Sequence, residues 1–455
     1  MADIIKQLQS VLTAEAVLTE PGDLAAYATD AKIKGLPPLV VVLPTETAQV
    51  QAIVRLCAQH RLPVIPRGAG TGTVGGAVPE FRALVLDLSR MNRIRTIDRD
   101  ELLADVQAGV LNADLQREAQ QVGLFYPPDP ASRATSTLGG NAATNAGGLR
   151  AVKYGVTADW VAALEVVTAD GQVIHTGVRT RKGVVGYDLT RLFIGSEGTL
   201  GIITALTMRL MPLPPAKKTL LGLFATLADA GRAVMAIVRS PIVPAAMELL
   251  DSTTLRAVKS RTGDLLPDDI ALVLLDVDGS EQEVEQQSAA LRELLAAADA
   301  LEVRVAADEV QADRLWLARR SVSPALYELR PHKYGEDVTV PIHHLVDLFD
   351  GVTALATKHR LPHACYGHAG DGNVHVNLLY DPADADEAAR AKAARAEVFR
   401  LTLALGGTIS GEHGVGIAKR EFLPWEQSSA MIDLQKRLKR AFDPLGLLNP
   451  GKVFP

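Results

Sequence analysis

Apolar and polar residues alternate along this chain with the periods of short strands and amphipathic helices. The clearest helix is expected at Thr45–His60, where apolar residues recur at helical spacing. Apolar runs at Leu39–Leu43 and Leu62–Ile65 flank it and predict two strands. This part of the chain therefore predicts a β-α-β unit. The apolar side of its helix consists of Val50, Ile53, Val54 and Cys57.

The rest of the first half continues with strand patterns and one further helix. A helix is expected at Asn112–Val122, because Gly123 ends its periodic pattern. The turn Ala169-Asp170-Gly171 separates two strand patterns and predicts a hairpin. The strands expected here are Ala83–Leu88, Leu103–Val110, Val161–Thr168 and Gln172–Thr176.

A proline-rich segment, Met211–Lys218, predicts a linker, because proline cannot donate to a strand ladder and disfavours a helix. Strand and helix patterns alternate after it, which predicts a second, α+β domain. Asp384–Leu405 is rich in alanine and regularly spaced charges, so one long exposed helix is expected. Ile432–Phe442 predicts a basic helix. The other expected elements are Thr219–Ala225, Leu227–Arg239, Ala271–Val277, Glu281–Ala298, Leu301–Val305, Asp313–Leu326, Asp337–Val340 and His344–His359.

Length and composition limit what the chain can be. At 455 residues it exceeds what one hydrophobic core usually organises, so two or three domains are expected. Its 47% hydrophobic and 22% charged residues and its net charge of −6 are typical of a soluble protein that does not bind nucleic acid. No signal peptide or membrane-spanning stretch is recognisable, so a cytoplasmic location is expected, with peripheral attachment to the inner membrane face left open. Cys57 and Cys365 cannot hold an iron–sulfur cluster alone.

Three stretches of the first half combine many glycines with a shortage of large side chains. They are Pro66–Gly76, Pro127–Gly148 and Phe193–Thr204. Glycine lets a ligand approach the backbone and lets successive N–H groups turn toward a phosphate, so the three stretches indicate a long ligand held by main chain. The first does not match the GxGxxG pattern of nicotinamide sites, because a strand pattern and not a helix follows it. The second is too poor in bulk to form a core.

A second set of candidate residues lies far from these stretches. GHAGDGNVHVN brings His368 and His375 close in sequence, and SGEHGVG supplies Glu412 and His413. Two imidazoles and one carboxylate are a typical ligand set for a divalent metal with open positions, which indicates His368, His375 and Glu412. His413 would then serve as a general base. Asn377 shares a strand face with His375 and is a candidate for hydrogen-bonding substrate.

Together these motifs resemble the vanillyl-alcohol-oxidase/p-cresol-methylhydroxylase family of FAD-binding flavoproteins. GHAGDGNVHVN, SGEHGVG and the terminal NPGKVF resemble its D-2-hydroxyacid dehydrogenase branch, which includes glycolate oxidase catalytic subunits and D-lactate dehydrogenases. The resemblance covers essentially the whole chain. It implies an α+β fold with a two-subdomain FAD-binding domain at 1–214 and an α+β substrate (cap) domain carrying the metal site at 215–415. A C-terminal helical segment at 416–455 would pack on the FAD domain and return to the flavin.

The resemblance also implies roles for individual residues. A segment similar to LWLARRSVSPAL carries an arginine that binds the substrate carboxylate, which is Arg319 here, and Lys333 is a second candidate. The metal, which would be Zn, Mn or Fe, and the base fall on the histidines and the glutamate named above. The first glycine loop lacks the histidine that often bonds the flavin, so non-covalent FAD is expected. The residues expected to hold FAD are Pro66, Arg67, Gly68, Ala69, Gly70, Thr71, Gly72, Pro128, Asp129, Thr137, Gly139, Gly140, Asn141, Thr144, Gly147, Gly148, Glu197, Gly198, Ile202, Ile203 and Asn449.

The implied function is oxidation of a small D-2-hydroxy acid, D-lactate or glycolate, to the 2-oxo acid. Electrons would pass to an acceptor other than a nicotinamide: an iron–sulfur subunit, an electron-transfer flavoprotein or a quinone. A homodimer is left open. The alternatives are a D-2-hydroxyglutarate dehydrogenase-like enzyme, an alkyl-glycerone-phosphate synthase-like flavoenzyme, a metal hydrolase without FAD and a non-catalytic electron-transfer subunit. The hydrolase leaves the glycine stretches unexplained, and the electron-transfer subunit leaves the metal ligands unexplained.

Overall fold

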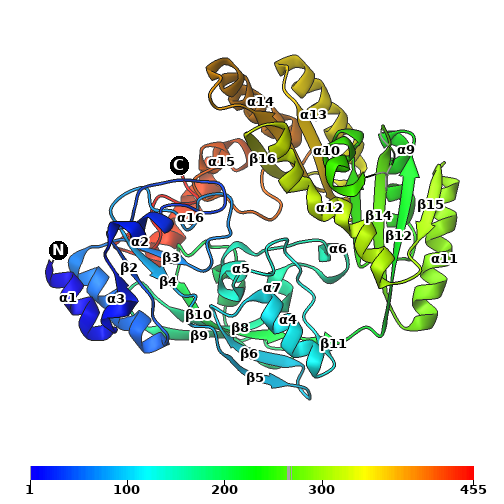
Figure 1. Ribbon diagram of the computed structural model, residues 1–455. Helices are drawn as coiled ribbons and strands as arrows, with labels where there is room; N and C mark the ends of the chain where they lie inside the picture. Colours follow the sequence, from blue (N-terminus) through cyan, green and yellow to red (C-terminus); the bar gives the residue numbers. More distant parts are fainter. Residues whose placement is uncertain (1, 264–266, 268) are drawn as a thin grey trace. The chain divides into compact units, whose positions relative to one another are not determined.

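The chain folds into two compact units in the computed structural model, which describes residues 2–263, 267 and 269–455 (Figure 1). Unit 1 comprises Met1–Gly148, Gly155–Leu213 and Glu412–Pro455. Unit 2 comprises the short segment Leu149–Tyr154 and the long segment Pro214–Gly411. Each unit is therefore assembled from parts of the chain that lie far apart in sequence.

Unit 1 contains two main sheets. In the four-stranded sheet, ordered β1-β2-β4-β3, β2 and β3 both run parallel to β4. The five-stranded sheet, ordered β5-β6-β10-β8-β9, is antiparallel throughout. The strands of this unit are β1 (Val17–Leu18), β2 (Val40–Val42), β3 (Val64–Arg67), β4 (Leu84–Asp87), β5 (Ile94–Asp98), β6 (Leu103–Gln107), β7 (Leu124–Phe125), β8 (Val161–Val167), β9 (Val173–Gly177), β10 (Ile202–Arg209) and β11 (Met211–Pro212).

The helix between β2 and β3 confirms the predicted β-α-β unit. Helix α3 spans Thr47–His60, begins with a capping box between Glu46 and Gln49, and ends at Arg61 in the left-handed conformation. Its buried residues are the four that the apolar pattern placed on one side. The other helices of unit 1 are α1 (Ala2–Val11), η1 (Ala14–Ala16), α2 (Pro21–Ala26), α4 (Asn112–Gln121), α5 (Leu138–Thr144), α7 (Thr157–Trp160), α8 (Leu189–Phe193), η4 (Arg420–Phe422), α15 (Leu423–Glu426) and α16 (Ser429–Phe442).

One expectation for unit 1 is wrong, and a second holds only in part. The second glycine-rich stretch does contribute to the core, because α5 forms within it and buries Leu138 and Ala142. The boundary between the two units falls between Leu213 and Pro214, within the expected linker, but β11 also lies in this segment and pairs Pro212 with Leu124 of β7. A proline is tolerated there because this ladder is short and its outer side needs no donor.

Unit 2 is built on one seven-stranded sheet, ordered β15-β12-β14-β13-β17-β18-β16, and every neighbouring pair is antiparallel. This arrangement confirms the predicted α+β character of the second half. The strands are β12 (Ala216–Phe224), β13 (Ala246–Leu250), β14 (Ala271–Gly279), β15 (Glu302–Val305), β16 (His332–Thr339), β17 (His363–His368) and β18 (Asn373–Tyr380).

Helices pack on both faces of this sheet. One face lies against α10 and α12 and shares a hydrophobic cluster with them. The opposite face carries Gly222, whose missing side chain makes room for Leu295 of α11, and Figure 1 shows α9 and α11 beside β12 and β14. The helices of unit 2 are α6 (Ala151–Tyr154), α9 (Leu227–Val238), α10 (Ser252–Thr262), α11 (Glu281–Ala297), α12 (Glu309–Leu329), η3 (Ile342–His344), α13 (Leu345–His359) and α14 (Ala385–Ala404).

Two further expectations fail in unit 2. Helix α14 is not exposed all round, because its alanines allow close packing against α13, β16 and β18, and one side with Val398 and Phe399 is buried. Strand β16 begins at His332 and not at the expected Asp337, so Lys333 also lies within it. Lys333 and Asp337 are both buried.

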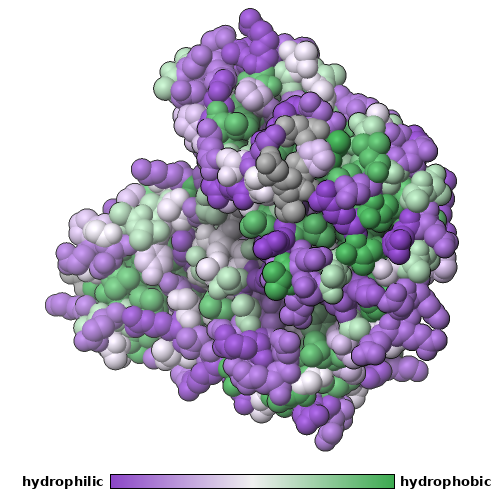
Figure 2. Space-filling view, turned by 45° about the vertical axis from the view of Figure 1, so that its right-hand side comes forward, coloured by the Kyte–Doolittle hydropathy of each residue, from purple (hydrophilic) through white to green (hydrophobic). Residues whose placement is uncertain are grey.

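The visible face of the molecule carries mainly hydrophilic residues with hydrophobic groups among them (Figure 2). Scattered exposed apolar side chains of this kind are normal for a folded protein. Within the described residues, no helix combines the length and the apolar character needed to cross a bilayer.

Candidate active site

A cavity of about 260 Å³ in unit 1 is lined by all three glycine-rich stretches. Most of the residues expected to hold FAD line it; Pro128, Asp129, Gly148 and Asn449 do not. Most of the other lining residues also belong to the three stretches: Thr73, Val74, Gly76, Pro130, Ala131, Ser132, Ser136, Ala143, Ala146 and Gly201. Ala77, Leu88 and Ala108 line the cavity from outside the stretches and were not indicated by the sequence, and Glu412 and His413 line it as well.

Close approach between the loops requires the absence of side chains at several glycines. A Cβ atom on Gly139 would lie 2.6 Å from the Cβ of Ala108, and one on Gly68 would lie 2.2 Å from the hydroxyl oxygen of Thr137. Gly198 has a φ of +71°, which residues with a side chain adopt only with strain. The glycines therefore hold the walls close together and leave main-chain atoms facing the cavity.

Two polar atoms in the wall fit a ligand with hydrogen-bonding groups. The side-chain oxygens of Thr73 and Ser136 are buried, and neither has a hydrogen-bond partner among the described residues. Buried hydroxyl groups are normally paired, because an unpaired one costs roughly 1–3 kcal/mol. A long polar cofactor with phosphates and hydroxyls would supply partners for such groups.

The expected residues that do not line the cavity support its loops. The side-chain amide of Asn449 donates to the carbonyl oxygens of Gly76 (2.8 Å) and Glu197 (2.7 Å), so it joins two loops of the wall. Gly148 has a φ of +128°, which requires a glycine. The carbonyl oxygen of Pro128 accepts from the side-chain amides of Asn112 (3.1 Å) and Gln116 (3.0 Å). These residues shape the loops that line the cavity.

Glu197 connects the third glycine stretch to the segment that follows His413. Its backbone is left-handed, with a φ of 52°, and its buried carboxylate accepts from the amides of Val415 and Gly416, both at 2.8 Å. Burial raises the pKa of this carboxyl group, although the two amide donors and the nearby cations of Lys419 and Lys452 act in the opposite direction. The side chain thus fixes the segment that carries two of the candidate chemical groups.

In unit 2, polar residues gather on the face of the sheet that also carries α10 and α12. The strand register places Glu248 of β13 opposite His368 of β17. Tyr366, also on β17, lies opposite His375 of β18. His375 in turn lies opposite Asp337 of β16. Residues paired across antiparallel strands share a face, as do residues two apart on one strand. The same face is leucine-rich at β12 and β14, so it changes from apolar to polar across the sheet.

Asp337 binds Ser410 and Gly411, the last two residues of unit 2, next to His375. Its carboxylate accepts from the side-chain amide of Asn373 (2.6 Å), the hydroxyl of Ser410 (3.3 Å) and the amide of Gly411 (3.0 Å). Because Gly411 is held there, the next two residues of the chain, Glu412 and His413, cannot lie far from this carboxylate.

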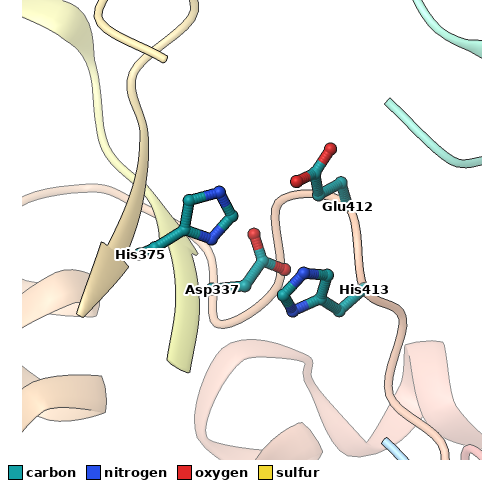
Figure 3. A group of neighbouring side chains, drawn as sticks. All are labelled: Asp337, His375, Glu412 and His413. Carbon is teal, nitrogen blue, oxygen red and sulfur yellow. The ribbon is translucent and has the colours of Figure 1, made fainter. Parts of the chain in front are cut away.

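Four side chains offer donor atoms that all lie within 4.8 Å of one another: Asp337, His375, Glu412 and His413. Figure 3 shows the side chains of Glu412 and His413 on one loop, with those of Asp337 and His375 beside them. Two imidazoles and two carboxylates are a donor set that suits a divalent transition metal. The expected ligand His368 is outside this group, and its ring centroid lies 5.3 Å from that of His375.

His368 and Arg319 both bind one buried acid. Nδ1 of His368 and Nε of Arg319 contact the two carboxylate oxygens of Glu248, whose side chain has no exposed surface. Burial alone would raise the pKa of the Glu248 carboxyl group, but the charges and hydrogen bonds of Arg319 and His368 outweigh it and lower this pKa. The guanidinium of Arg319 also lies over the ring of Tyr366, 4.6 Å from its centroid.

The two remaining substrate candidates are both buried in the same sheet. Nζ of Lys333 donates to the hydroxyl of Ser323, at 3.0 Å, and lies on the sheet face that bears His375. The side-chain amide of Asn377 donates to the carbonyl oxygens of Ala364 (3.3 Å) and His375 (3.1 Å). The structure therefore brings both residues to the polar face of the sheet, where Asn377 also braces strand β18.

Two protein-family models match this chain. A model described as the FAD binding domain matches residues 38–177, and a model described as FAD linked oxidases, C-terminal domain, matches residues 213–453. The second match alone spans more than half of the chain. The chain belongs to the FAD-linked oxidase family.

Relatives of known name and solved structures agree with this membership. The glycolate oxidase subunit GlcD of Bacillus subtilis (strain 168) is 43% identical over 418 residues, covering 92% of this chain and 89% of the relative. A probable mitochondrial D-lactate dehydrogenase of Danio rerio is 36% identical over 422 residues, covering 92% and 84%. The structure of p-cresol methylhydroxylase with substrate bound superimposes with a TM-score of 0.85 at 20% identity, over 99% of this chain and 96% of that one. The expected two-domain fold of this FAD-linked oxidase is thereby confirmed.

Sequence reasoning missed Glu248 and Asp337 in this FAD-linked oxidase. Glu248 is the single charged residue in the strand Ala246–Leu250, and a lone acid in an apolar run is a signal of a buried, paired group. Asp337 follows Glu336, and nothing in the sequence says which of the two neighbours faces His375. That choice depends on the register between β16 and β18.

Acid or denaturant is expected to release intact flavin from this FAD-linked oxidase. The described residues that line the cavity include no cysteine and a single histidine, His413, and the first glycine loop has neither residue type. The measurement is flavin absorbance in the filtrate and in the precipitate after denaturation. Flavin that stays on denatured wild-type protein would contradict the prediction, and its loss in His413→Ala would then identify the attachment site.

Proposed function

We propose that this protein oxidises a small D-2-hydroxy acid, glycolate or D-lactate, to the 2-oxo acid and passes the electrons to an acceptor other than a nicotinamide. The observation that carries this proposal is the placement of Glu412 and His413. Both line the glycine-walled cavity, and both follow directly on Gly411, which Asp337 holds beside His375. FAD, when bound in the cavity, would accept the hydride from C2 of the acid.

For the metal we propose His368, His375 and Glu412 as ligands, with Zn, Mn or Fe as the ion. The metal, when bound, would act as a Lewis acid on the substrate hydroxyl. Asp337 already accepts three donors from the protein, so its proposed role is to hold the loop that carries Glu412. The proposed set of three ligands does not include His413, whose imidazole is therefore available for another role in the reaction.

His413 is proposed as the general base that takes the proton of the substrate hydroxyl. An imidazole changes its charge near neutral pH, which suits it to this transfer. The bonds between Glu197 and the amides of Val415 and Gly416 restrict the segment that follows it. A base held in this way can remain oriented toward the reacting hydroxyl without a large ordering cost at each turnover.

Arg319 of α12 is proposed to bind the substrate carboxylate, together with Lys333 and Asn377 from the polar face of the sheet. A guanidinium presents donors in a planar fork that matches a carboxylate. Its orientation is set by Glu248 on one edge and by the ring of Tyr366 beneath it. Burial of the cation in unit 2 strengthens its attraction for an anionic substrate.

The proposed electron acceptor is a separate subunit, an electron-transfer flavoprotein or a quinone. Support for a subunit comes from the relative in Bacillus subtilis, which is named as a subunit of a glycolate oxidase. The two cysteines of this chain, Cys57 and Cys365, are both buried, and burial raises the pKa of both thiols. An iron–sulfur relay would therefore have to come from a partner.

Anaerobic addition of D-lactate or glycolate is expected to bleach the flavin, whereas L-lactate bleaches it at least tenfold more slowly. An acid held at both its carboxylate and its hydroxyl presents only one of its C2 substituents to the acceptor, so the enantiomers differ in the group they present. The measurement is stopped-flow absorbance of the purified holoenzyme with each acid, including D-2-hydroxyglutarate.

The set of acids separates the alternatives. Fast bleaching by D-2-hydroxyglutarate alone would favour a dehydrogenase for that larger acid. A bound flavin that no 2-hydroxy acid reduces would contradict the proposed reaction and favour a transferase of the alkyl-glycerone-phosphate synthase type. Equal rates of flavin bleaching by both lactate enantiomers would contradict the proposed binding of the acid through both its carboxylate and its hydroxyl.

A further inference from the structure

Glu248 is the acid through which two proposed functional residues of unit 2 are joined. One of its carboxylate oxygens contacts Nδ1 of His368, and the other contacts Nε of Arg319. None of its side-chain surface is exposed, and the side chains of His368 and Arg319 are 6% and 11% exposed. The three groups therefore interact away from bulk water, where such contacts are strong and directional.

The position of Glu248 in the fold suggests a role beyond packing. It is the only charged residue described in β13, and its neighbours on the same face, Ala246 and Leu250, belong to the hydrophobic cluster under α10 and α12. A carboxylate in such a place is costly unless it is paired, and apolar residues of similar volume often do as well or better for stability. Stability alone thus gives little reason for an acid at this point.

The contact with Glu248 determines which nitrogen of His368 carries the proton. A carboxylate accepts hydrogen bonds, so Nδ1 must donate, and Nε2 is then the nitrogen that bears the lone pair in the neutral ring. Histidine ligands of metals are commonly oriented in this way by a carboxylate on the other ring nitrogen. Glu248 thus holds the ring of His368 in the tautomer that a metal requires.

The contact with Arg319 fixes a second orientation. Glu248 takes the Nε edge of the guanidinium, while Tyr366 lies against its plane. Tyr366 and Glu248 come from neighbouring strands of the same sheet face, so the two contacts are set by one strand register. The side chain of Arg319 therefore has one preferred rotation relative to His368.

We propose that Glu248 is a positioning residue that couples the metal ligand His368 to the carboxylate-binding Arg319. One acid would then set both the affinity for the metal and the recognition of the anionic substrate. This inference rests on the function proposed above, and it adds a residue that touches neither the substrate nor the metal.

The chain provides a matched control on the opposite face of the same sheet. Glu336 of β16 is also buried and pairs with Arg395 at 2.6 Å, and that guanidinium lies over the rings of Tyr334 and Phe399. The two ion pairs are similar in burial and chemistry. Only the pair with Glu248 contacts a candidate metal ligand, so substitutions at the two positions separate positioning from general stability.

The test compares Glu248→Gln with Glu336→Gln in FAD-loaded protein. A glutamine side chain replaces one of the two carboxylate oxygens by an NH2 group that only donates, so the separate acceptors for His368 and Arg319 are not both kept. We expect Glu248→Gln to bind Zn²⁺ or Mn²⁺ about 10- to 100-fold more weakly, measured by competition with a chelator, and to show a raised KM for the acid. Glu336→Gln should keep the wild-type metal affinity and KM.

Glu248→Asp, which keeps the charge but shortens the side chain, should recover part of the metal affinity. If Glu248→Gln does not accumulate as folded protein, Glu248→Asp decides, because wild-type affinity and KM in that variant would overturn the inference. Equal losses in Glu248→Gln and Glu336→Gln would also overturn it and assign both acids to structure. A wild-type protein that binds no divalent metal would overturn the proposed metal site itself, whereas metal bound equally by wild type and Glu248→Gln would overturn only the role of Glu248.

Discussion

Replacing His375 or Glu412 by alanine is expected to remove the metal and nearly abolish oxidation of the acid. Each change deletes one ligand from a set of three, so both the affinity for the ion and its Lewis acidity toward the hydroxyl are lost. His375 and Glu412 belong both to the proposed ligand set and to the group of donor atoms within 4.8 Å, so the result does not depend on the third ligand. The measurements are metal content and steady-state turnover of the purified variants.

A matched control is His363→Ala. His363 lies on β17, where its ring contacts the hydroxyl of Thr353 at 3.1 Å, and its position in the strand places it on the face opposite His368. This variant should keep both metal and turnover. The flavin content of Glu412→Ala must be measured as well, because Glu412 lines the cavity. Full metal occupancy in both His375→Ala and Glu412→Ala would refute the proposed site.

Local elements of this chain could be predicted because short-range physics dictates them. The four apolar residues of α3 recur at helical spacing, and all four are buried. The Ala169-Asp170-Gly171 turn joins β8 and β9 as expected, because Gly171 takes a φ of +76° that a tight turn favours. Such patterns need no knowledge of distant segments.

The order of the strands in unit 2 could not be predicted in the same way. Strand β16 lies at the edge next to β18, although α13 and β17 separate the two strands along the chain. No local pattern specifies that pairing, which depends on the free energy of packing the complete sheet. Since Asp337 meets His375 only through this pairing, its place in the site could not be foreseen.

The candidate ligands themselves were accessible from sequence because imidazoles and carboxylates in glycine-rich surroundings are unusual. The structure adds how they are held: Glu197 binds the amides after His413, and Asp337 binds the amide before Glu412. These supporting acids come from segments more than 70 positions away in the chain. Residues that orient others carry no motif of their own, so they emerge only from three-dimensional contacts.

His413→Ala is expected to keep the metal and to slow reduction of the flavin by about two to four powers of ten, which corresponds to roughly 3–5 kcal/mol in the activation free energy. The reason is that only the acceptor of the hydroxyl proton is removed, while the three proposed ligands and Arg319 remain. Binding of the acid should therefore change little. The measurement is stopped-flow flavin reduction at saturating acid, together with metal analysis of the same sample.

The role of His413 has a direct alternative, because one of its ring nitrogens belongs to the same group of donor atoms as His375 and Glu412. If His413 acts as a base, added imidazole should restore part of the reduction rate in His413→Ala, since a free base can enter the space left by the side chain. If His413 is a ligand, the variant should lose metal as completely as Glu412→Ala, and imidazole should not restore the rate without added metal. The first outcome assigns proton transfer to His413, and the second moves this residue into the metal site in place of His368.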